Sequence, residues 1–324
     1  MTVSNHLTNA LVLAIALLGI ACASILLVFA EKELSPYAAT FNRLSMATLI
    51  FLIWHVSRLF LRAGPETIQG SKTESSKSLF LFSLPNLLDI GLMVLSSIAF
   101  ASSLSLWAWS LTQTSIANST LLNNMMPIFT TLGAWLFLRE SFTPKFLLGM
   151  AIAVLGAILI GLKDLQVTHG LIGDEAALGA AMLSAINILS VEQLRKRFET
   201  SWIMLWTSFV GSLFVLLIVL ALHEQLFPRT MIGWAAVISL AAISQALGQG
   251  LLTYSLKVFS AGFVSVSMLA IPFIAAALAT VIFDQRLTWF NGFAFGIVLL
   301  GIYIAISSQF SKTNTATVLN VSEG

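Results

Sequence analysis

Polar side chains interrupt several long apolar runs of this chain at positions where they could bind a small molecule. Asn123 and Asn124 stand side by side one turn before Pro127, in an apolar segment that ends at Arg139-Glu140. Proline removes one backbone hydrogen bond of a helix, so a carbonyl group near Asn123 is left free. The two amide groups could therefore line a cavity and receive a polar ligand, or they could bridge neighbouring helices.

Two glutamines and one arginine offer similar chemistry in other apolar runs. Gln245 and Gln249 are one helical turn apart and share a helix face, with Gly248 and Gly250 beside them. Side-chain amides deep in a membrane need hydrogen-bond partners, which favours a position of the two glutamines in the wall of a cavity. Arg43 also lies within an apolar run, where it could anchor a carboxylate or a phosphate. Alternatively, its side chain could extend to the membrane surface.

Aromatic residues and prolines complete the set of candidates. Trp107 and Trp109 fall near one end of an apolar run, and Tyr254 falls near the end of another. These three side chains could belong to the aromatic belt at the membrane surface, or they could stack on a substrate at the two mouths of a cavity. Pro127 and Pro272 predict kinks, which could also serve as hinges.

Other kinds of chemistry find no support in the sequence. It contains no HExxH, GxSxG or paired Asp motif, and its four histidines are scattered without the spacing of metal ligands. The single cysteine, Cys22, excludes a disulfide within the chain. We therefore expect no enzymatic activity, no metal and no cofactor. No acidic residue lies clearly at mid-membrane depth, which favours a facilitator or exchanger over a proton antiporter.

The elements that must position the candidate residues are membrane helices. Of the 324 residues, 58% are hydrophobic and 9% are charged, whereas a soluble domain carries about 25% charged residues. Most of the surface must therefore face a lipid bilayer. The net charge is only +2 and no basic cluster is present, so we expect no nucleic-acid partner. Runs of about 20 apolar residues predict ten membrane helices, at 10–30, 38–61, 85–111, 115–138, 143–162, 174–195, 201–222, 230–256, 260–283 and 287–308.

The predicted helices divide the chain into two groups of five. The first apolar run lacks the basic segment of a signal peptide and continues to Ala30, which predicts an uncleaved membrane helix. The predicted parts are a short amino-terminal segment (1–9), the first group (10–162) with a polar loop (62–79), an outer linker (163–173), the second group (174–308) and a disordered tail (309–324).

The distribution of basic residues predicts the orientation of the chain. If the amino terminus is cytoplasmic, eleven Lys and Arg residues fall on the inner side of the membrane and four on the outer side. Basic residues concentrate in the cytoplasmic loops of membrane proteins. We therefore expect a multi-pass protein of the cell inner membrane with both termini in the cytoplasm.

The segment around Asn123 has a second copy later in the chain, and the two are aligned when Pro127 is placed on Pro272. In this proline alignment SIANSTLLNNMMPIFTTLGAWLFLRESFT (115–143) falls on SAGFVSVSMLAIPFIAAALATVIFDQRLT (260–288). Further upstream the spacing differs, and an upstream alignment places Arg43 on Thr207. Because each copy belongs to a group of five predicted helices, an odd number, the second group must enter the membrane from the opposite face. Inverted repeats of this kind build transporters that open a central site first to one side and then to the other.

These segments resemble a known family. A polar helix that ends in SLWAWSLTQTSIA, a proline-bearing helix that closes in L-x-E-x-x-T and a Gly-rich helix are similar to the EamA-type repeat of the drug/metabolite transporter superfamily. The resemblance covers residues 10–308 and implies an all-α integral membrane fold of ten helices, arranged as two inverted five-helix repeats around a central cavity. One position departs from it, because the exit glutamate is Glu140 in the first copy and Gln285 in the second. A role that needs a paired carboxylate is therefore not expected.

Together these patterns predict a secondary transporter that exports small polar metabolites, amino acids or related compounds, by alternating access. The alternatives are a multidrug exporter of the same superfamily and, more distantly, a membrane enzyme or a structural or receptor protein. Glycines of the fifth and tenth predicted helices are expected to pack at the periphery or between two copies in a homodimer; they are Gly149, Gly156, Gly296 and Gly301. The residues expected to bind the substrate are Arg43, Trp107, Trp109, Asn123, Asn124, Gln245, Gln249 and Tyr254.

Overall fold

The chain folds as a bundle of helices. In this computed structural model the described residues contain no strand, and they are 3–62, 85–114, 116–162, 171–283, 292–305 and 307. Residues 63–79 of the predicted polar loop, residues 163–170 of the predicted linker, Gln285 and the predicted tail 309–324 lie outside these ranges.

Each predicted helix overlaps an observed helix or a set of adjacent helices. The first half contains α1 (Val3–Ala30), α2 (Pro36–Arg62), α4 (Leu87–Gln113), α5 (Ile116–Asn123), α6 (Met126–Leu138) and α7 (Pro144–Leu162). The second half contains α8 (Leu171–Arg195), α9 (Thr200–Ala221), α10 (Met231–Ser239), the π-helical segment η1 (Leu240–Gln249), α11 (Gly250–Ser255), α12 (Ala261–Met268), α13 (Ile271–Phe283) and a last helix (Gly292–Ala305). Within the described ranges, seven helices are long and apolar enough to cross a membrane and two more are apolar but shorter. The number of ten crossings stays a prediction.

Local side chains fix where several helices begin. The Asn86 side chain accepts a hydrogen bond from the Asp89 backbone N–H at 2.8 Å, and the Asp89 carboxylate accepts one from the Asn86 N–H at 3.1 Å. This reciprocal cap starts α4, and Arg197 adds an ion pair to Asp89 at 2.6 Å. Because Arg197 follows α8, the pair also ties the start of α4 to the end of α8.

The two copies found in the sequence have the same helix bounds. The proline alignment places α5 on α12 and α6 on α13, residue for residue. In both copies a short break separates the helices, and the proline is the second residue after the break. The backbone N–H of the second break residue donates to the carbonyl one turn earlier, at 3.1 Å from Met125 and at 3.0 Å from Ala270. The break is thus a shared property of the repeat.

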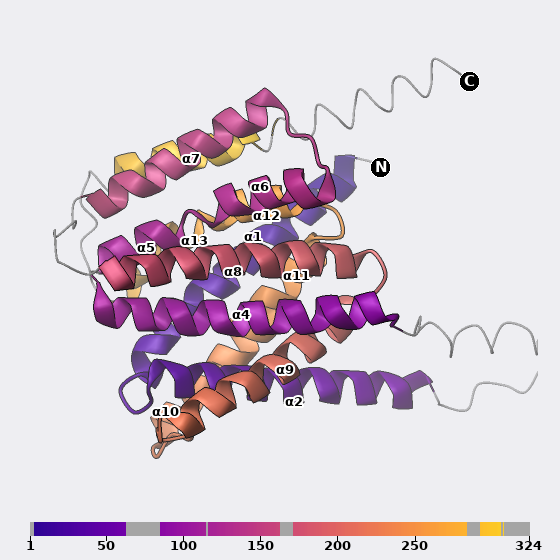
Figure 1. Ribbon diagram of the computed structural model, residues 1–324, viewed down its shortest axis with the longest axis vertical. Helices are drawn as coiled ribbons and strands as arrows, with labels where there is room; N and C mark the ends of the chain where they lie inside the picture. Colours follow the sequence, from indigo (N-terminus) through magenta and orange to yellow (C-terminus); the bar gives the residue numbers. More distant parts are fainter. Residues whose placement is uncertain are drawn as a thin grey trace, which may run out of the picture.

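The α7 helix and the last helix pack against each other at one end of the bundle (Figure 1). A Cβ on Gly301 would lie 2.3 Å from the backbone nitrogen of Ala153, and a Cβ on Gly156 would lie 2.9 Å from that of Val298. The proline alignment relates Gly156 to Gly301 and Ala153 to Val298. The contact is therefore reciprocal, as it is about a two-fold axis.

This glycine contact bears on the predicted homodimer. A Cβ on Gly149 would lie 2.5 Å from the backbone nitrogen of Ala305, so Gly149 also serves the packing of α7 on the last helix. Gly296 has no neighbouring atom within 4 Å of an added Cβ among the described residues. Three of the four glycines are thus used within one chain, and nothing in the structure supports a homodimer.

Long helices of the two halves pack side by side. Figure 1 shows α4 running along α8 and α2 running along α9. The α1 helix contacts η1, where a Cβ on Gly19 would lie 3.0 Å from the Cα of Gly248. The absence of side chains on both glycines permits this close approach, which brings the end of η1 to the middle of α1.

Candidate functional site

A cavity of about 720 Å³ lies between the two halves of the bundle. The first half contributes residues of α1, α2 and α4 and of the break between α5 and α6. The second half contributes residues of α8, of η1 and α11, and of the break between α12 and α13. The volume is within the usual range of sites for small molecules.

Repeat-related positions of the two halves line the cavity together. In the proline alignment the pairs are Leu104 with Gln249, Trp107 with Leu252, Thr120 with Ser265, Asn123 with Met268, Asn124 with Leu269, Met126 with Ile271, and Pro127 with Pro272. The upstream alignment places α1 on α8, and there the pairs are Ile20 with Ser184, Ala23 with Asn187, and Ser24 with Ile188. The cavity therefore lies where the two repeats meet.

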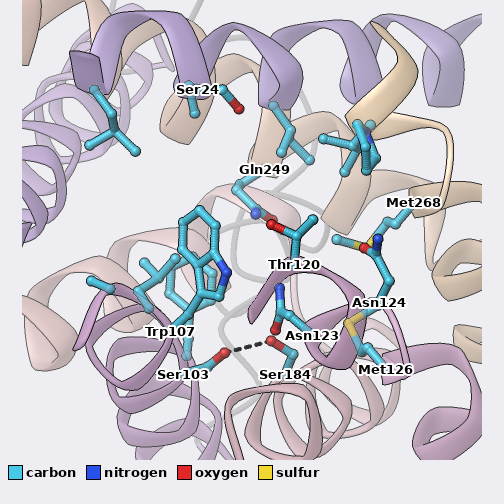
Figure 2. A pocket seen from close by; sticks show the side chains of 18 of the residues that line it. Ser24, Ser103, Trp107, Thr120, Asn123, Asn124, Met126, Ser184, Gln249 and Met268 are labelled. Carbon is cyan, nitrogen blue, oxygen red and sulfur yellow. Dashed lines mark hydrogen bonds between the residues drawn. The ribbon is translucent and has the colours of Figure 1, made fainter. Parts of the chain in front are cut away.

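The polar groups of the wall are distributed unequally between the repeats. Asn123 and Asn124 of the first break correspond to Met268 and Leu269 of the second. In exchange, Gln249 of the second repeat corresponds to Leu104 of the first. Figure 2 shows Trp107, Asn123 and Gln249 pointing into the same space. The cavity is thus pseudo-symmetric in its backbone and asymmetric in its chemistry.

Several buried polar atoms of the wall have no hydrogen-bond partner among the described residues. They are Trp107 Nε1, Asn123 Oδ1 and Asn187 Oδ1. Nearby, the hydroxyls of Ser103 and Ser184 are hydrogen-bonded at 2.6 Å, and Ser103 also donates to the Ala180 carbonyl at 2.8 Å (Figure 2). Buried polar groups are usually paired in proteins. A polar ligand that reached these unpaired N–H and carbonyl groups would supply the hydrogen-bond partners that they lack.

The α2 helix places Arg43 in the wall of the same cavity. Its side chain is only 5% exposed, and its Nε–H donates a hydrogen bond of 2.8 Å to Oε1 of Gln245 on η1. The guanidinium group thus does not extend to the membrane surface. Gln245 is fully buried behind Arg43 and is not part of the wall.

The structure brings together most of the residues that the sequence singled out. Five of the eight predicted binding residues line the cavity, namely Arg43, Trp107, Asn123, Asn124 and Gln249. Pro127 and Pro272 line it as well. Gln245 reaches it only through its hydrogen bond to Arg43. Trp109 and Tyr254 are not among the lining residues, and Tyr254 is 45% exposed at the surface.

Several polar residues of the wall were not singled out in the sequence, and Ser184 and Asn187 are two of them. Ser184 and Asn187 lie one turn apart on α8, in an Ala-rich stretch where their type alone carries little information. A signal was present, however. The upstream alignment, which relates Arg43 to Thr207, also places α8 on α1, and it puts both residues on the face that α1 turns to the cavity.

The cavity extends to one end of the bundle. Glu31 in the turn after α1, Pro36 at the start of α2 and Thr112 near the end of α4 all line it. Desolvation by neighbouring groups raises the pKa of the Glu31 carboxyl above the ordinary value of 4.5, because the charged form is less well solvated there. These residues form a mouth that carries an acidic group.

Packed side chains separate the cavity from the opposite end. Ile188 and Leu252 of the wall belong to a buried apolar cluster that also contains Phe146. Phe142 stacks on Phe146 with ring centroids 5.0 Å apart, and an added Cβ on Gly262 would lie 2.9 Å from the Phe142 ring. At this end the start of α12 contacts side chains of α7 and of the loop before it.

Hydrogen bonds between helices reinforce the closed end. The Glu192 carboxylate of α8 accepts a hydrogen bond of 3.1 Å from the backbone N–H of Ala261, the first residue of α12. Arg195 donates to the carbonyls of Thr253 at 3.1 Å and Phe198 at 2.5 Å. The charged side chains near the end of α8 are therefore bound to the backbone of elements that would have to move if this end opened.

Comparison with known proteins identifies both repeats. The model of the EamA-like transporter family matches residues 8–162 and again residues 171–307. Solute carrier family 35 member G1 of Mus musculus is 23% identical over 203 residues, which cover 59% of this chain and 55% of that protein. The Homo sapiens protein of the same name is 23% identical over 237 residues, which cover 68% of this chain and 64% of that protein. The match thus spans less than two thirds of both relatives.

A solved structure supports the fold. One protein crystal structure superimposes with a TM-score of 0.76 at 13% sequence identity, over 93% of this chain and 99% of the other. An identity this low shows the fold alone. The two family matches, in contrast, fall on the two repeats whose shared helix breaks enclose the cavity. The chain is a multi-pass membrane protein that belongs to the EamA-like transporter family.

Proposed function

We propose that this chain is a secondary transporter that exports small polar metabolites, amino acids or related compounds, through the cell inner membrane by alternating access. Membership of the family already implies solute transport across a membrane. The observation that carries the finer proposal is the cavity, whose wall combines repeat-related positions of both halves, unpaired amide and indole groups, and Arg43. Such a wall suits a small solute with several polar groups.

Alternating access follows from the relation between the repeats. If the second repeat crosses the membrane in the opposite direction, the two can exchange conformations about a fixed central site. The reciprocal packing of Gly156 on Val298 and of Gly301 on Ala153 supports a two-fold relation of this kind. The distribution of Lys and Arg in the loops supports an orientation in which the mouth at Glu31 lies on the outer side. This conformation is then the outward-open one.

In the same proposal the closed end is the inner gate. The stacked Phe142 and Phe146 and the cap of α12 by Glu192 would separate during the return to the inward-open state. The breaks before Pro127 and Pro272 would let the outer or inner half of each helix pair tilt by itself. Both termini then lie in the cytoplasm.

The rival proposal of a multidrug exporter predicts a cavity rich in aromatic side chains. Among the described residues of the wall, only Phe100 and Trp107 are aromatic. The balance of polar and aromatic groups therefore favours small polar metabolites over large apolar drugs.

Exchange in proteoliposomes tests the proposed function. Vesicles that contain the purified protein are loaded with a mixture of isotopically labelled amino acids and organic acids, and unlabelled solutes are supplied outside. Mass spectrometry of the external medium should show labelled solutes that leave faster than from protein-free vesicles. A release equal to that of protein-free vesicles for every solute would contradict the proposal, whereas selective release of apolar cationic dyes from parallel vesicles would favour the multidrug exporter.

A further inference from the structure

Among the residues that the structure describes, Arg43 is a buried cation without an acidic partner. Its side chain is 5% exposed, and within the described part of the chain it forms no ion pair with a carboxylate. The carboxylate that shares the cavity, Glu31, lies at the mouth and makes no ion pair with Arg43. Burial of a charge is costly unless the charge is paired. The arginine is therefore held in a state that an anion would relieve.

The hydrogen bond to Gln245 sets the direction of the guanidinium group. Gln245 accepts from Nε–H, on the side of the group that faces η1. A guanidinium carries five N–H donors, and the four on the two Nη atoms have no acceptor among the described residues. This paired, planar set of donors matches the two oxygens of a carboxylate or phosphate.

The chemical type of residue 245 is as informative as its position. A glutamate there would form a buried ion pair and neutralise Arg43, whereas the glutamine orients the group and leaves its charge uncompensated. The amide nitrogen of Gln245 is itself buried without a partner among the described residues, so the glutamine is not placed for its own hydrogen bonds. Its evident role is to position Arg43.

We propose that Arg43, positioned by Gln245, is an oxyanion-binding subsite, and that the transported solute carries a carboxylate or phosphate group. This inference rests on the proposed function and names the substrate class of the same cavity. The unpaired oxygens of Asn123 and Asn187 then accept hydrogen bonds from hydroxyl or amino groups of the same solute. Amino acids, hydroxy acids and sugar phosphates all have this combination of groups.

The decisive substitution is Gln245→Glu, which replaces the amide group by a carboxylate of the same shape and supplies Arg43 with an internal partner. Vesicles are loaded with matched pairs that differ in the anionic group, L-glutamate with L-glutamine and glucose 6-phosphate with glucose. In the native protein we expect at least one anionic member to exchange about tenfold faster than its neutral partner. Gln245→Glu and Arg43→Gln should each remove that preference, because both leave no free guanidinium charge.

The matched control is Gln225→Glu, which makes the same chemical change on an exposed loop outside the cavity. It should leave the preference for anions intact. Thermal unfolding of each variant shows whether it folds, and Gln245→Glu should unfold at the native temperature or above it because its new charge is paired. Preference for the neutral members, or an unchanged preference in Gln245→Glu, would overturn the inference while transport itself stands.

A binding measurement separates the subsite from transport. Inorganic phosphate or acetate, compared with chloride at equal ionic strength, should raise the unfolding temperature of the native protein and of Gln225→Glu but not of Gln245→Glu. Phosphate alone or acetate alone would show which oxyanion the site prefers. Equal shifts in all three proteins, or none in any, would sink the subsite. Vesicles that exchange no solute would instead count against the proposed function.

Discussion

The break before Pro127 and the break before Pro272 share one backbone and differ in chemistry. The helices around them have identical lengths, and the hydrogen bonds across the two breaks are nearly equal, at 3.1 Å from Met125 and at 3.0 Å from Ala270. The side chains at the first break are nevertheless Asn123 and Asn124, and those at the second are Met268 and Leu269.

The difference separates two tasks that the repeat performs. The backbone break is present in both halves. This fits a role in a conformational change that each half makes in turn. The pair of amides at the break is present in the first half only, which fits contacts to an asymmetric solute that binds in one orientation. Two kinds of substitution can test whether the two tasks are separate. One replaces the side chains at a break and keeps its backbone, and the other replaces the proline and keeps the polar side chains.

The largest effect is expected when the first break receives the side chains of the second. The double substitution Asn123→Met and Asn124→Leu should lower the exchange rate in proteoliposomes by roughly 100-fold, because each lost hydrogen bond to a bound solute is worth about 1–3 kcal/mol. The unfolding temperature should stay close to that of the native protein. Met268→Leu is the matched control at the second break and should exchange normally. Exchange within about twofold of native by the double variant would assign the amides to helix packing.

Substitution of the prolines tests whether the backbone breaks serve motion. Pro127→Ala and Pro272→Ala each restore a backbone N–H that can donate within a continuous helix. If both breaks serve motion, the two variants should lower the maximal exchange rate by a similar factor, about tenfold, with little change in the half-saturating concentration. A lower maximal exchange rate in only one of the two variants would show that the repeats move unequally. Native exchange rates in both variants would show that the prolines are static kinks.

The glycine contact between α7 and the last helix sharpens the comparison in a region without polar chemistry. Gly301→Ala should lower stability by about 1–3 kcal/mol, since the new Cβ would meet the backbone of Ala153 at 2.3 Å. Gly156→Ala should cost less, because its nearest backbone atom, the Val298 nitrogen, is 2.9 Å away and its closer contact, Cγ2 of Val298 at 2.6 Å, is on a side chain that can shift. Gly296→Ala, with open space around it, is the control. Thermal unfolding in detergent ranks the three variants by stability. Equal losses of stability in all three would contradict the reciprocal contact.

The repeat explains how far sequence reasoning reaches in this molecule. The sequence predicted kinks at Pro127 and Pro272, and the structure has a helix break just before each of them, because proline acts on its own helix whatever surrounds it. Trp107 and Trp109 could not be separated in the same way by residue type. With one residue between them on a helix they point to opposite sides, and only the packing of α4 shows that Trp107 faces the cavity.

Other features left no readable pattern. A helix that is apolar all round has no polar face from which its periodicity can be read, so the π-helical stretch η1 was not predicted. For the same reason Gln245 and Gln249 were expected to share one role, whereas the structure places Gln249 in the wall and Gln245 behind Arg43. Which neighbour a buried amide meets depends on tertiary packing, which no single helix specifies.

The smallest effect concerns the two ends of the cavity. The upstream alignment relates Glu31 at the mouth to Arg195, which is bound to backbone carbonyls at the closed end. Burial raises the pKa of Glu31 above 4.5, so the folded protein binds this proton more tightly than the unfolded chain does. The contribution of this group to stability is therefore fully present below pH 4.5 and is lost as the pH rises through the raised pKa.

Replacement of the Glu31 carboxyl by an amide removes the loss of stability that accompanies its ionisation. Glu31→Gln should unfold at a slightly higher temperature than the native protein at neutral pH, and the difference should shrink to nothing as the pH approaches 4.5 and falls below it. Thermal unfolding of both proteins across that range measures the difference directly. If the carboxyl instead repels an anion at the mouth, the same variant should also lower the half-saturating concentration of anionic solutes at neutral pH. A stability difference that grew toward acid pH would show that Glu31 is stabilised as a carboxylate, and would contradict this prediction.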